Sequence, residues 1–327
     1  MKPLDVDVIC NREDLPFFNP YQSTKISTKY FNVCNRGHLL RTTRAVDINF
    51  RELASEKTDR AIIFIGPDQH WGEFTDLFKK VVDNYKYKVM ITDEPIWSKL
   101  KWNPNKPTKA HQHSLDLLQP DVVGYSCLVD CRLCPVKSFY WTGFVDKYVT
   151  EEDPLSPCAV DSVAQSPFKV RRVISAGRYH RKFRSWSEIE NLCEGSKLLH
   201  EMVHFGAMSY QDLTDRVQGS LFQFQPRCGF HFHPLRSLQS WFSGTIPLIF
   251  ADDLECEELL EHCEKLSLKN FENCIIFNED NIHEAIAACR DVGCCNTMLN
   301  NIKEMDLTNY TTEKVCENIY KSILEID

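Results

Sequence analysis

The sequence lacks any apolar run long enough to cross a bilayer. None of its 327 residues belongs to an uninterrupted stretch of about 18 apolar side chains, the length that a spanning helix needs. The opening residues, MKPLDVDVICNREDLPFF, also lack the apolar core of a secretory signal peptide. We therefore expect a cytoplasmic protein without a membrane span.

A net positive charge and nucleotide-binding glycine motifs are also missing. The net charge is −8, which argues against a duplex nucleic-acid partner because such partners usually need a basic face. No Gly-x-x-x-x-Gly-Lys loop and no full Gly-x-Gly-x-x-Gly motif occur, so ATPase and dehydrogenase functions have little support. What is present, 43% hydrophobic and 26% charged residues, is typical of a globular protein long enough for two domains.

Cysteine is abundant, with 15 residues. Without a secretion signal, we interpret them as reduced thiols. Several lie in apolar patterns, as Cys193 and Cys289 do, where a thiol acts as a small hydrophobic group.

Three of the cysteines allow a different interpretation. Cys127, Cys131 and Cys134 have the C-x₃-C-x₂-C spacing with which radical S-adenosylmethionine enzymes hold a four-iron cluster. Zinc is a second alternative, with His111 or His113 as the fourth ligand. We favour ordinary thiols, because so many cysteines produce such spacings by chance and the chain that follows does not resemble the rest of a barrel.

Strands and helices alternate from residue 61 onward. Residues 1–60 show no sustained period and are expected to hold irregular structure with one or two strands. The β-α-β-α-β order that follows implies a parallel sheet with right-handed crossovers. The predicted elements are strands at Ala61–Ile65, Lys88–Thr92 and Asp121–Tyr125 and helices at Trp71–Tyr85 and Gln112–Leu118.

A Pro-, Ser- and acid-rich stretch, residues 150–168, has the composition of a linker. We therefore expect an N-terminal domain at 1–165 and a C-terminal domain at 166–327. Both are predicted to be α/β and Rossmann-like, facing each other across a cleft, with ligands outside the carboxyl ends of the strands. The second series comprises strands at 173–175, 202–205, 221–224, 246–250 and 274–277 and helices at 187–193, 210–217, 235–242, 254–266, 282–290 and 312–324, the last capped by Thr311 or Thr312.

The helix at 235–242 is a candidate ligand-binding element. Pro234 suits its first turn, and Gly244 suits a left-handed position at its end. Arg236 and Gln239 share one stripe of this helix, so a guanidinium and an amide lie side by side. Arginine binds diphosphates with two parallel hydrogen bonds, but a solvated face explains the same pattern.

A basic cluster follows the predicted linker. Six cationic side chains lie between Arg171 and Arg184 in an otherwise acidic chain, and Arg178 comes directly after the strand at 173–175. A cation at the carboxyl end of a strand can neutralise a leaving diphosphate. A solvated basic loop is the simpler alternative.

Four segments resemble, in order, the second domain of GT-B-fold glycosyltransferases. They are SAGRYHRK, HFGAMSYQDLTDRVQGS, QPRCGFHFHPLRSLQSWFSGTIPLIF and IIFNEDNIHEAIAAC, which together cover about residues 171–290. The Gly-Thr-Ile-Pro-Leu stretch is similar to phage DNA α-glucosyltransferases, and Pro-Arg…Leu-Arg-Ser-Leu-Gln to exostosin-like transferases. The pattern also resembles the donor-binding domain of glycogen-synthase-like enzymes.

The resemblance implies roles for five residues in binding a nucleoside-diphosphate sugar. Arg178 and Arg236 would bind the diphosphate, with Lys182 as a further phosphate ligand. Gln239 would hold the ribose, and His231 would touch the sugar or phosphate.

The sequence departs from the family pattern at three of these positions. Gln239 and His231 stand where glutamates are usual, and Lys182 comes one residue early. A glutamine can still bond a ribose, but with a neutral acceptor. The donor sugar and the stereochemistry therefore stay open.

The first domain would carry the acceptor and a general base. Asp68 is the first candidate and His70 the second, since both follow the strand that ends at Ile65. A helix-capping role for such residues is equally consistent with the pattern. No Asp-x-Asp motif occurs in a suitable place, so we expect neither a metal nor a cofactor beyond the nucleotide sugar.

The sequence thus predicts transfer of a sugar from a UDP- or GDP-sugar to a hydroxyl of a glycan or glycoconjugate. A modified DNA base is an alternative acceptor. A radical S-adenosylmethionine enzyme using Cys127, Cys131 and Cys134 is a second alternative. A non-catalytic module that binds sugar nucleotides is a third, motivated by the missing glutamates.

Overall fold

The chain folds as two compact units in the computed structural model. The first comprises Met1–Phe144 with Tyr310–Asp327, and the second comprises Val145–Asn309. The structure describes residues 2–11, 29–39, 53–65, 81–92, 109–126, 128–141, 169–177, 184–204, 216–225, 232 and 234–326.

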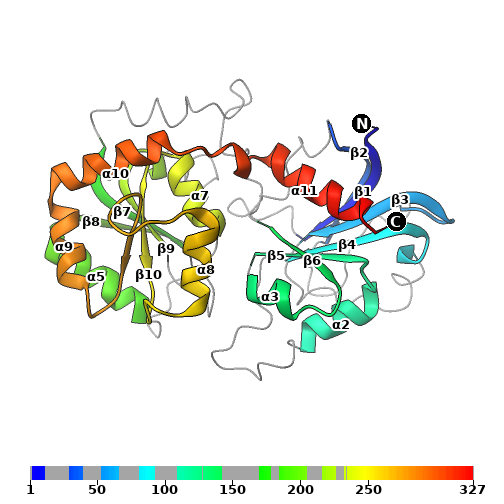
Figure 1. Cartoon of the computed structure of the whole chain (residues 1–327), viewed down its shortest axis with the longest axis horizontal. Coiled ribbons are helices and arrows are strands. Elements are labelled where there is room, and N and C mark those ends of the chain that lie inside the picture. The colour runs from blue at the N-terminus through cyan, green and yellow to red at the C-terminus, as the bar shows by residue number, and fades with distance from the viewer. Residues whose placement is uncertain are drawn as a thin grey trace. The chain divides into compact units, whose positions relative to one another are not determined.

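The first unit is built on a parallel sheet of six described strands, in the order β2-β1-β3-β4-β5-β6. Described helices pack on it, and α11 comes from the end of the chain (Figure 1). The elements are β1 (Leu4–Asn11), β2 (Phe31–Leu39), β3 (Thr58–Ile65), β4 (Tyr85–Thr92), α2 (Lys109–Leu118), β5 (Val122–Tyr125), α3 (Leu128–Leu133), β6 (Lys137–Tyr140) and α11 (Thr312–Leu324).

Both faces of this sheet are buried, which explains the unbroken apolar run in β3. Successive side chains of a strand point to opposite faces. Ala61 and Ile63 pack in one cluster with Ile319 and other residues of α11. Ile62 and Phe64 pack in the other cluster, with residues of α2.

The last helix departs from the expected domain boundaries of 1–165 and 166–327. Helix α11 belongs to the first unit, where Tyr320 Oη donates to the Lys2 carbonyl oxygen at 3.0 Å. Its amphipathic pattern was predicted, and of the two predicted caps, Thr311 and Thr312, the cap is Thr311, whose Oγ1 accepts from the Lys314 N–H at 3.3 Å. An apolar stripe shows that a helix packs on a sheet, but not on which of two sheets.

The second unit is built on a parallel sheet of five described strands, in the order β11-β10-β9-β7-β8. Within it, α5 and α9 lie on one face of the sheet and α7 and α8 on the other (Figure 1). The elements are β7 (Val170–Gly177), α5 (Arg184–Ser196), β8 (Leu199–His204), β9 (Ser220–Gln225), α7 (Pro234–Phe242), β10 (Ile246–Phe250), α8 (Glu257–Leu266), β11 (Ile275–Phe277), α9 (Ile282–Arg290), α10 (Val292–Glu304) and the 3₁₀ turn η3 (Thr308–Tyr310).

The two faces of the second sheet differ in chemistry. On the face toward α5, Phe224 of β9 packs edge-on against Trp186, with ring centroids 5.6 Å apart. On the face toward α7, the same strand presents Gln223 and Gln225, both buried. Aromatic packing therefore joins the sheet to α5, whereas buried amides of the sheet contact α7.

Most predicted elements are present with slightly different ends. The sequence correctly placed β3, β4, β5 and the strands of the second unit, and the bounds of β10, α9 and α11 are as predicted. The predicted helices Trp71–Tyr85 and Tyr210–Val217 lie largely outside the described residues, as does the predicted linker at 150–168. Elements that the sequence did not place are β6, α3, α10 and η3, and the one or two strands expected in residues 1–60 were not given the positions of β1 and β2.

Within the described residues, no helix combines the length and the apolar character that crossing a bilayer would require.

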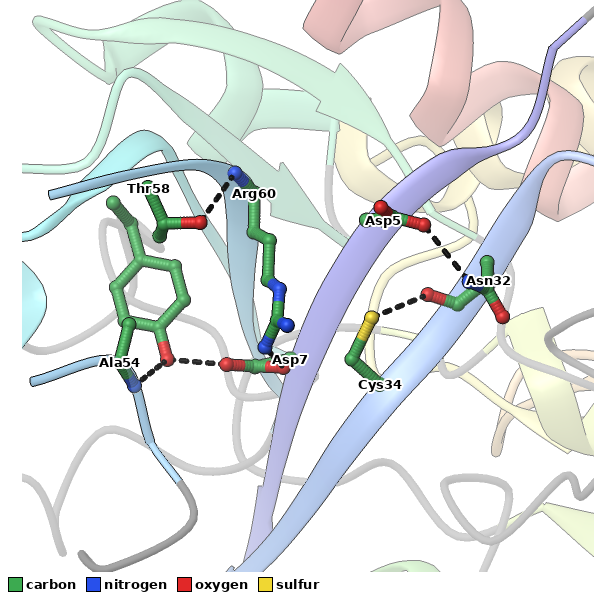
Figure 2. Close-up of polar contacts among 8 residues, drawn as sticks. Asp5, Asp7, Asn32, Cys34, Ala54, Thr58 and Arg60 are labelled. Carbon is green, nitrogen blue, oxygen red and sulfur yellow. Dashed lines mark hydrogen bonds and ion pairs between the residues drawn. The ribbon is translucent and has the colours of Figure 1, made fainter. Parts of the chain in front are cut away.

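A buried carboxylate lies in the middle of the first sheet. Asp7 of β1 is fully buried and accepts a short hydrogen bond from the Tyr85 hydroxyl. Arg60 Nη1 lies 3.5 Å from Asp7 Oδ1 (Figure 2), and the Ala54 N–H donates to Tyr85 Oη at 3.0 Å. Burial raises the pKa of Tyr85, so the hydroxyl stays protonated and donates a hydrogen bond to the carboxylate.

We predict that Tyr85→Phe destabilises the protein by about 1–3 kcal/mol, because it leaves part of a buried carboxylate without a donor. Urea unfolding measures this loss. Tyr320→Phe is the matched control, since it removes a hydroxyl that bonds only a neutral carbonyl, and it should cost about 1 kcal/mol or less. Equal losses in the two variants would contradict a special role for the Asp7 contact.

A half-buried lysine lies just before β7, at the amino end of the second sheet. Lys169 Nζ donates to the carbonyl oxygens of Gln218 and Ser220 at 3.1 and 3.3 Å, and to Thr245 Oγ1 at 3.3 Å. Desolvation lowers the pKa of Lys169 from 10.5 to about 7. The unfolded chain therefore binds more protons than the folded protein above about pH 7, and stability rises with pH up to the unfolded value.

Replacing Lys169 by methionine should remove this rise. We expect Lys169→Met to gain stability relative to wild type most strongly at pH 6, with the gain shrinking as the pH approaches 10, because the neutral amine is no longer penalised there. Urea unfolding at several pH values measures the difference. The exposed Lys265→Met is the control, and a pH-independent effect at Lys169 would contradict the prediction.

Candidate functional site

The strand order places one topological switch point in each sheet. In the second unit, the chain runs from β7 to β8 on one side and then crosses back to β9 on the other side of β7. In the first unit, the same reversal separates β1 from β3. Ligands of open α/β sheets bind outside the carboxyl ends of the strands at such points. The ends of β7 and β9 are therefore the first place to seek a site in the second unit.

Most predicted site residues lie outside the described residues. Two of them follow strands that border the switch points: in the sequence, Arg178 comes directly after β7, and Asp68 comes three residues after β3. The predicted residues outside the described ranges are Asp68, His70, Arg178, Lys182 and His231.

A polar layer joins β9 to α7 in the described part of the second unit. We call it the β9–α7 seam and define it as Gln223, Gln225, Ser237, Gln239 and Ser240, all of which are buried. Gln223 Nε2 donates to Gln239 Oε1 at 3.0 Å, and Ser240 Oγ donates to Gln223 Oε1 at 2.7 Å. Ser237 Oγ donates to Gln225 Oε1 at 3.0 Å.

Local sequence explains why these groups meet. Strand β9 reads SLFQFQ, and its alternation sends Phe222 and Phe224 to one face and the two glutamines to the other. Helix α7 starts at Pro234 and is followed by Gly244, whose φ of 59° is the left-handed position that the sequence predicted. These two residues set the start and the end of the helix.

The predicted neighbours Arg236 and Gln239 do lie side by side. Arg236 Nη1 is 3.5 Å from Gln239 Oε1. Gln239 is only 2% exposed, so the alternative of a solvated face is wrong for this residue. Arg236 is partly exposed. A cation thus stands at the edge of a buried amide network near the start of α7.

Gln225 ends β9 and differs from the other members of the seam. It is 4% exposed, and its Nε2 has no hydrogen-bond partner in the described structure. Gln225 Oε1 accepts from the Ser237 hydroxyl, and this hydroxyl also lies 3.4 Å from His262 Nε2 of α8. The ring of His262 stacks on Phe232, with centroids 5.7 Å apart.

The cysteine motif lies in the first unit, around α3. Tyr125 Oη donates to Cys134 Sγ at 3.2 Å, and burial raises the pKa of Cys131 to about 12, which favours a protonated thiol. Cys127 lies outside the described residues. The sheet that carries α3 is an open one with β2 and β6 at its ends, not the barrel that the radical-enzyme alternative would need.

The expectation for two cysteines can also be compared with the structure. Cys193 and Cys289 are buried, as their apolar patterns predicted. After β10, the Glu255 N–H donates to Asp253 Oδ1 at 2.9 Å in a turn. In the described ranges, no three His, Cys, Asp or Glu side chains are grouped to hold a metal ion.

Solved structures match both units in one alignment. A protein from Listeria monocytogenes described as a UDP-N-acetylglucosamine 2-epimerase aligns over 98% of this chain and 95% of its own, with 12% identity and a TM-score of 0.53. HepE of Anabaena, in complex with UDP, aligns over 98% of this chain and 100% of its own, with 10% identity and a TM-score of 0.50. The chain has the GT-B fold. No protein-family model matches this GT-B chain, and no curated protein matches it.

The resemblance found in the sequence is therefore confirmed at the level of the fold. Sequence reasoning singled out Arg236 and Gln239 of α7 but missed the other members of the seam and His262. The signal was present, because two glutamines alternate with phenylalanines in a strand that is otherwise apolar. A parallel strand buried on both faces is normally apolar throughout.

Removing one donor of the seam should be costly. We predict that Ser240→Ala lowers stability by about 1–3 kcal/mol, because Gln223 Oε1 loses its buried donor. Ser322→Ala is the control, since it removes a hydroxyl that donates to the Asn318 carbonyl oxygen at 2.9 Å in an exposed position. Thermal unfolding of both variants measures the difference, and similar small shifts would show that the seam adds no stability.

Proposed function

We propose that this chain is a glycosyltransferase that transfers a sugar from a nucleoside-diphosphate donor to a hydroxyl group. The donor would be a UDP- or GDP-sugar, and the acceptor a glycan or glycoconjugate. The observation that carries the proposal is the buried β9–α7 seam, which holds Gln239, next to Arg236, against β9, a strand that borders the switch point of a GT-B sheet. The UDP in the HepE structure supports a nucleotide ligand for this fold.

The proposed chemistry at the donor site is electrostatic. Negative charge develops on the diphosphate as the sugar leaves, and Arg178 and Arg236 would neutralise it, assisted by Lys182. Gln239 would hold the ribose, and His231 would contact the sugar or phosphate. The neutral Gln239 already receives a hydrogen bond from Gln223, which orients its amide before any ligand arrives.

The acceptor would bind to the first unit. Asp68, or else His70, would remove the proton of the attacking hydroxyl, because its position after β3 borders the switch point of that sheet. We propose no metal or further cofactor, since arginine side chains and the start of α7 would stabilise the leaving group.

Two other functions would give different results in the experiment described below. An epimerase would change the sugar of the nucleotide donor without transfer, and the Listeria neighbour is named for that activity. A non-catalytic module would bind the donor without turnover, as the absence of glutamate at 231 and 239 suggests. A modified DNA base remains the alternative acceptor.

A panel of UDP- and GDP-sugars tests the proposal. Thermal stabilisation identifies the bound donor, since a ligand of the folded state raises the melting temperature. Nucleotide release and chromatography of the products then separate transfer, epimerisation and binding alone. No binding by any member of the panel would overturn the proposal.

For the preferred donor, we predict that Arg236→Ala lowers kcat/KM by at least about tenfold, because a charged hydrogen bond to phosphate is worth about 1.5–3 kcal/mol. Arg290→Ala, an exposed arginine in the last turn of α9, is the matched control and should keep wild-type turnover. Unchanged turnover in Arg236→Ala would remove this residue from the donor site.

A further inference from the structure

The unpartnered amide of Gln225 is the starting point. Its oxygen accepts from Ser237, but its nitrogen, buried like the rest of the side chain, donates to nothing in the described structure. A buried donor without an acceptor costs roughly 1–3 kcal/mol, and native proteins keep very few of them. An additional acceptor at this position would remove the cost.

A comparison with Gln223, on the same strand, shows that the unused amide donor is specific to Gln225. Both ends of the Gln223 amide are used, by Gln239 and by Ser240. The two glutamines share one face of β9, yet only the one at the carboxyl end retains a donor. The unused group therefore lies where ligands of this fold class bind, rather than in the middle of the sheet.

The start of α7 adds a second attraction for an anion. Ser237 is the fourth residue of this nine-residue helix, so the amide that it contacts lies beside the first turn. The first N–H groups of a helix have no acceptor within the helix, and its dipole favours negative charge there. A phosphate oxygen could accept from both the helix and the Gln225 amide.

A chain of hydrogen bonds can orient this amide. The single hydroxyl proton of Ser237 can go to Gln225 or to His262, which lie 3.0 and 3.4 Å away. If His262 Nε2 carries a proton and donates it to Ser237, the hydroxyl donates to Gln225 Oε1 and the NH₂ group is left for a ligand. If Ser237 instead donates to His262 Nε2, the Gln225 nitrogen must donate to Ser237 Oγ. The amide is then flipped and presents its oxygen to the ligand, which repels a phosphate.

We propose that Gln225 Nε2 donates a hydrogen bond to a diphosphate oxygen of the nucleotide, with Ser237 and His262 as positioning residues that hold the amide in this orientation. This inference rests on the proposed function and adds a contact to it. A phosphate accepts but cannot donate when fully ionised, so it selects the amide orientation with the nitrogen toward the ligand.

Calorimetric titration of the full chain with UDP, GDP, uridine and guanosine tests the contact. For the diphosphate that binds wild type, Gln225→Met should weaken binding about tenfold, because one hydrogen bond to a charged group is lost. Gln225→Glu should weaken it further, because a carboxylate repels phosphate. The affinity for the matching nucleoside should change less than about twofold, since the contact is to phosphate alone.

Two further variants separate positioning from folding. Ser237→Thr keeps the hydroxyl and should bind the diphosphate within about twofold of wild type, whereas Ser237→Ala should bind it several-fold more weakly, with nucleoside affinity unchanged in both. Gln218→Met, two residues before β9 begins, is the control for Gln225→Met. The melting temperature of each variant verifies that it is folded.

The outcomes are distinguishable. If wild type binds UDP or GDP and Gln225→Met binds it equally well, the amide faces a buried water and the inference is wrong while the proposed function stands. If Ser237→Thr and Ser237→Ala lose affinity equally, the hydroxyl does not position the amide. If wild type binds neither nucleotide and no donor, the proposed function fails and the inference fails with it.

Discussion

Hydrogen bonding between buried amides of β9 and serines of α7 is the interaction on which the second unit depends. The opposite face of β9 is held by aromatic packing of Phe224 on Trp186, which needs no directional bonds. On the α7 face, the desolvation cost of burying Gln223 and Gln225 is offset because hydrogen-bond partners lie at fixed positions on the helix. The seam therefore sets how α7 sits on the sheet and, with it, where Arg236 stands.

Polar groups at different levels of the sheets behave differently. In the middle of the first sheet, Asp7 is met by Tyr85 and Arg60, and at the amino end of the second, Lys169 Nζ donates to three oxygens. At the carboxyl side, Gln225 keeps an unused donor. Satisfied networks contribute rigidity, whereas an unsatisfied group keeps a capacity for binding. This contrast follows the side of an α/β sheet on which ligands are expected.

Much of the fold could be predicted because its signals are local. Apolar runs such as Ala61–Ile65 indicate strands buried on both faces, and Pro234 with Gly244 marks the start and the end of α7. The pairing of Arg236 with Gln239 followed from helical spacing. The partners of Gln223 could not be predicted, because they depend on which helix covers which face of the sheet.

The sequence by itself determined the alternation of strands and helices, the ends of α7 and the resemblance to the GT-B fold, since all of these depend on residues close together in the chain. The tertiary structure decided that α11 packs in the first unit and that Gln225 meets Ser237 and His262. Those contacts join segments that are distant in sequence. Periodicity shows that a face is buried, but only the packed fold shows what lies against it.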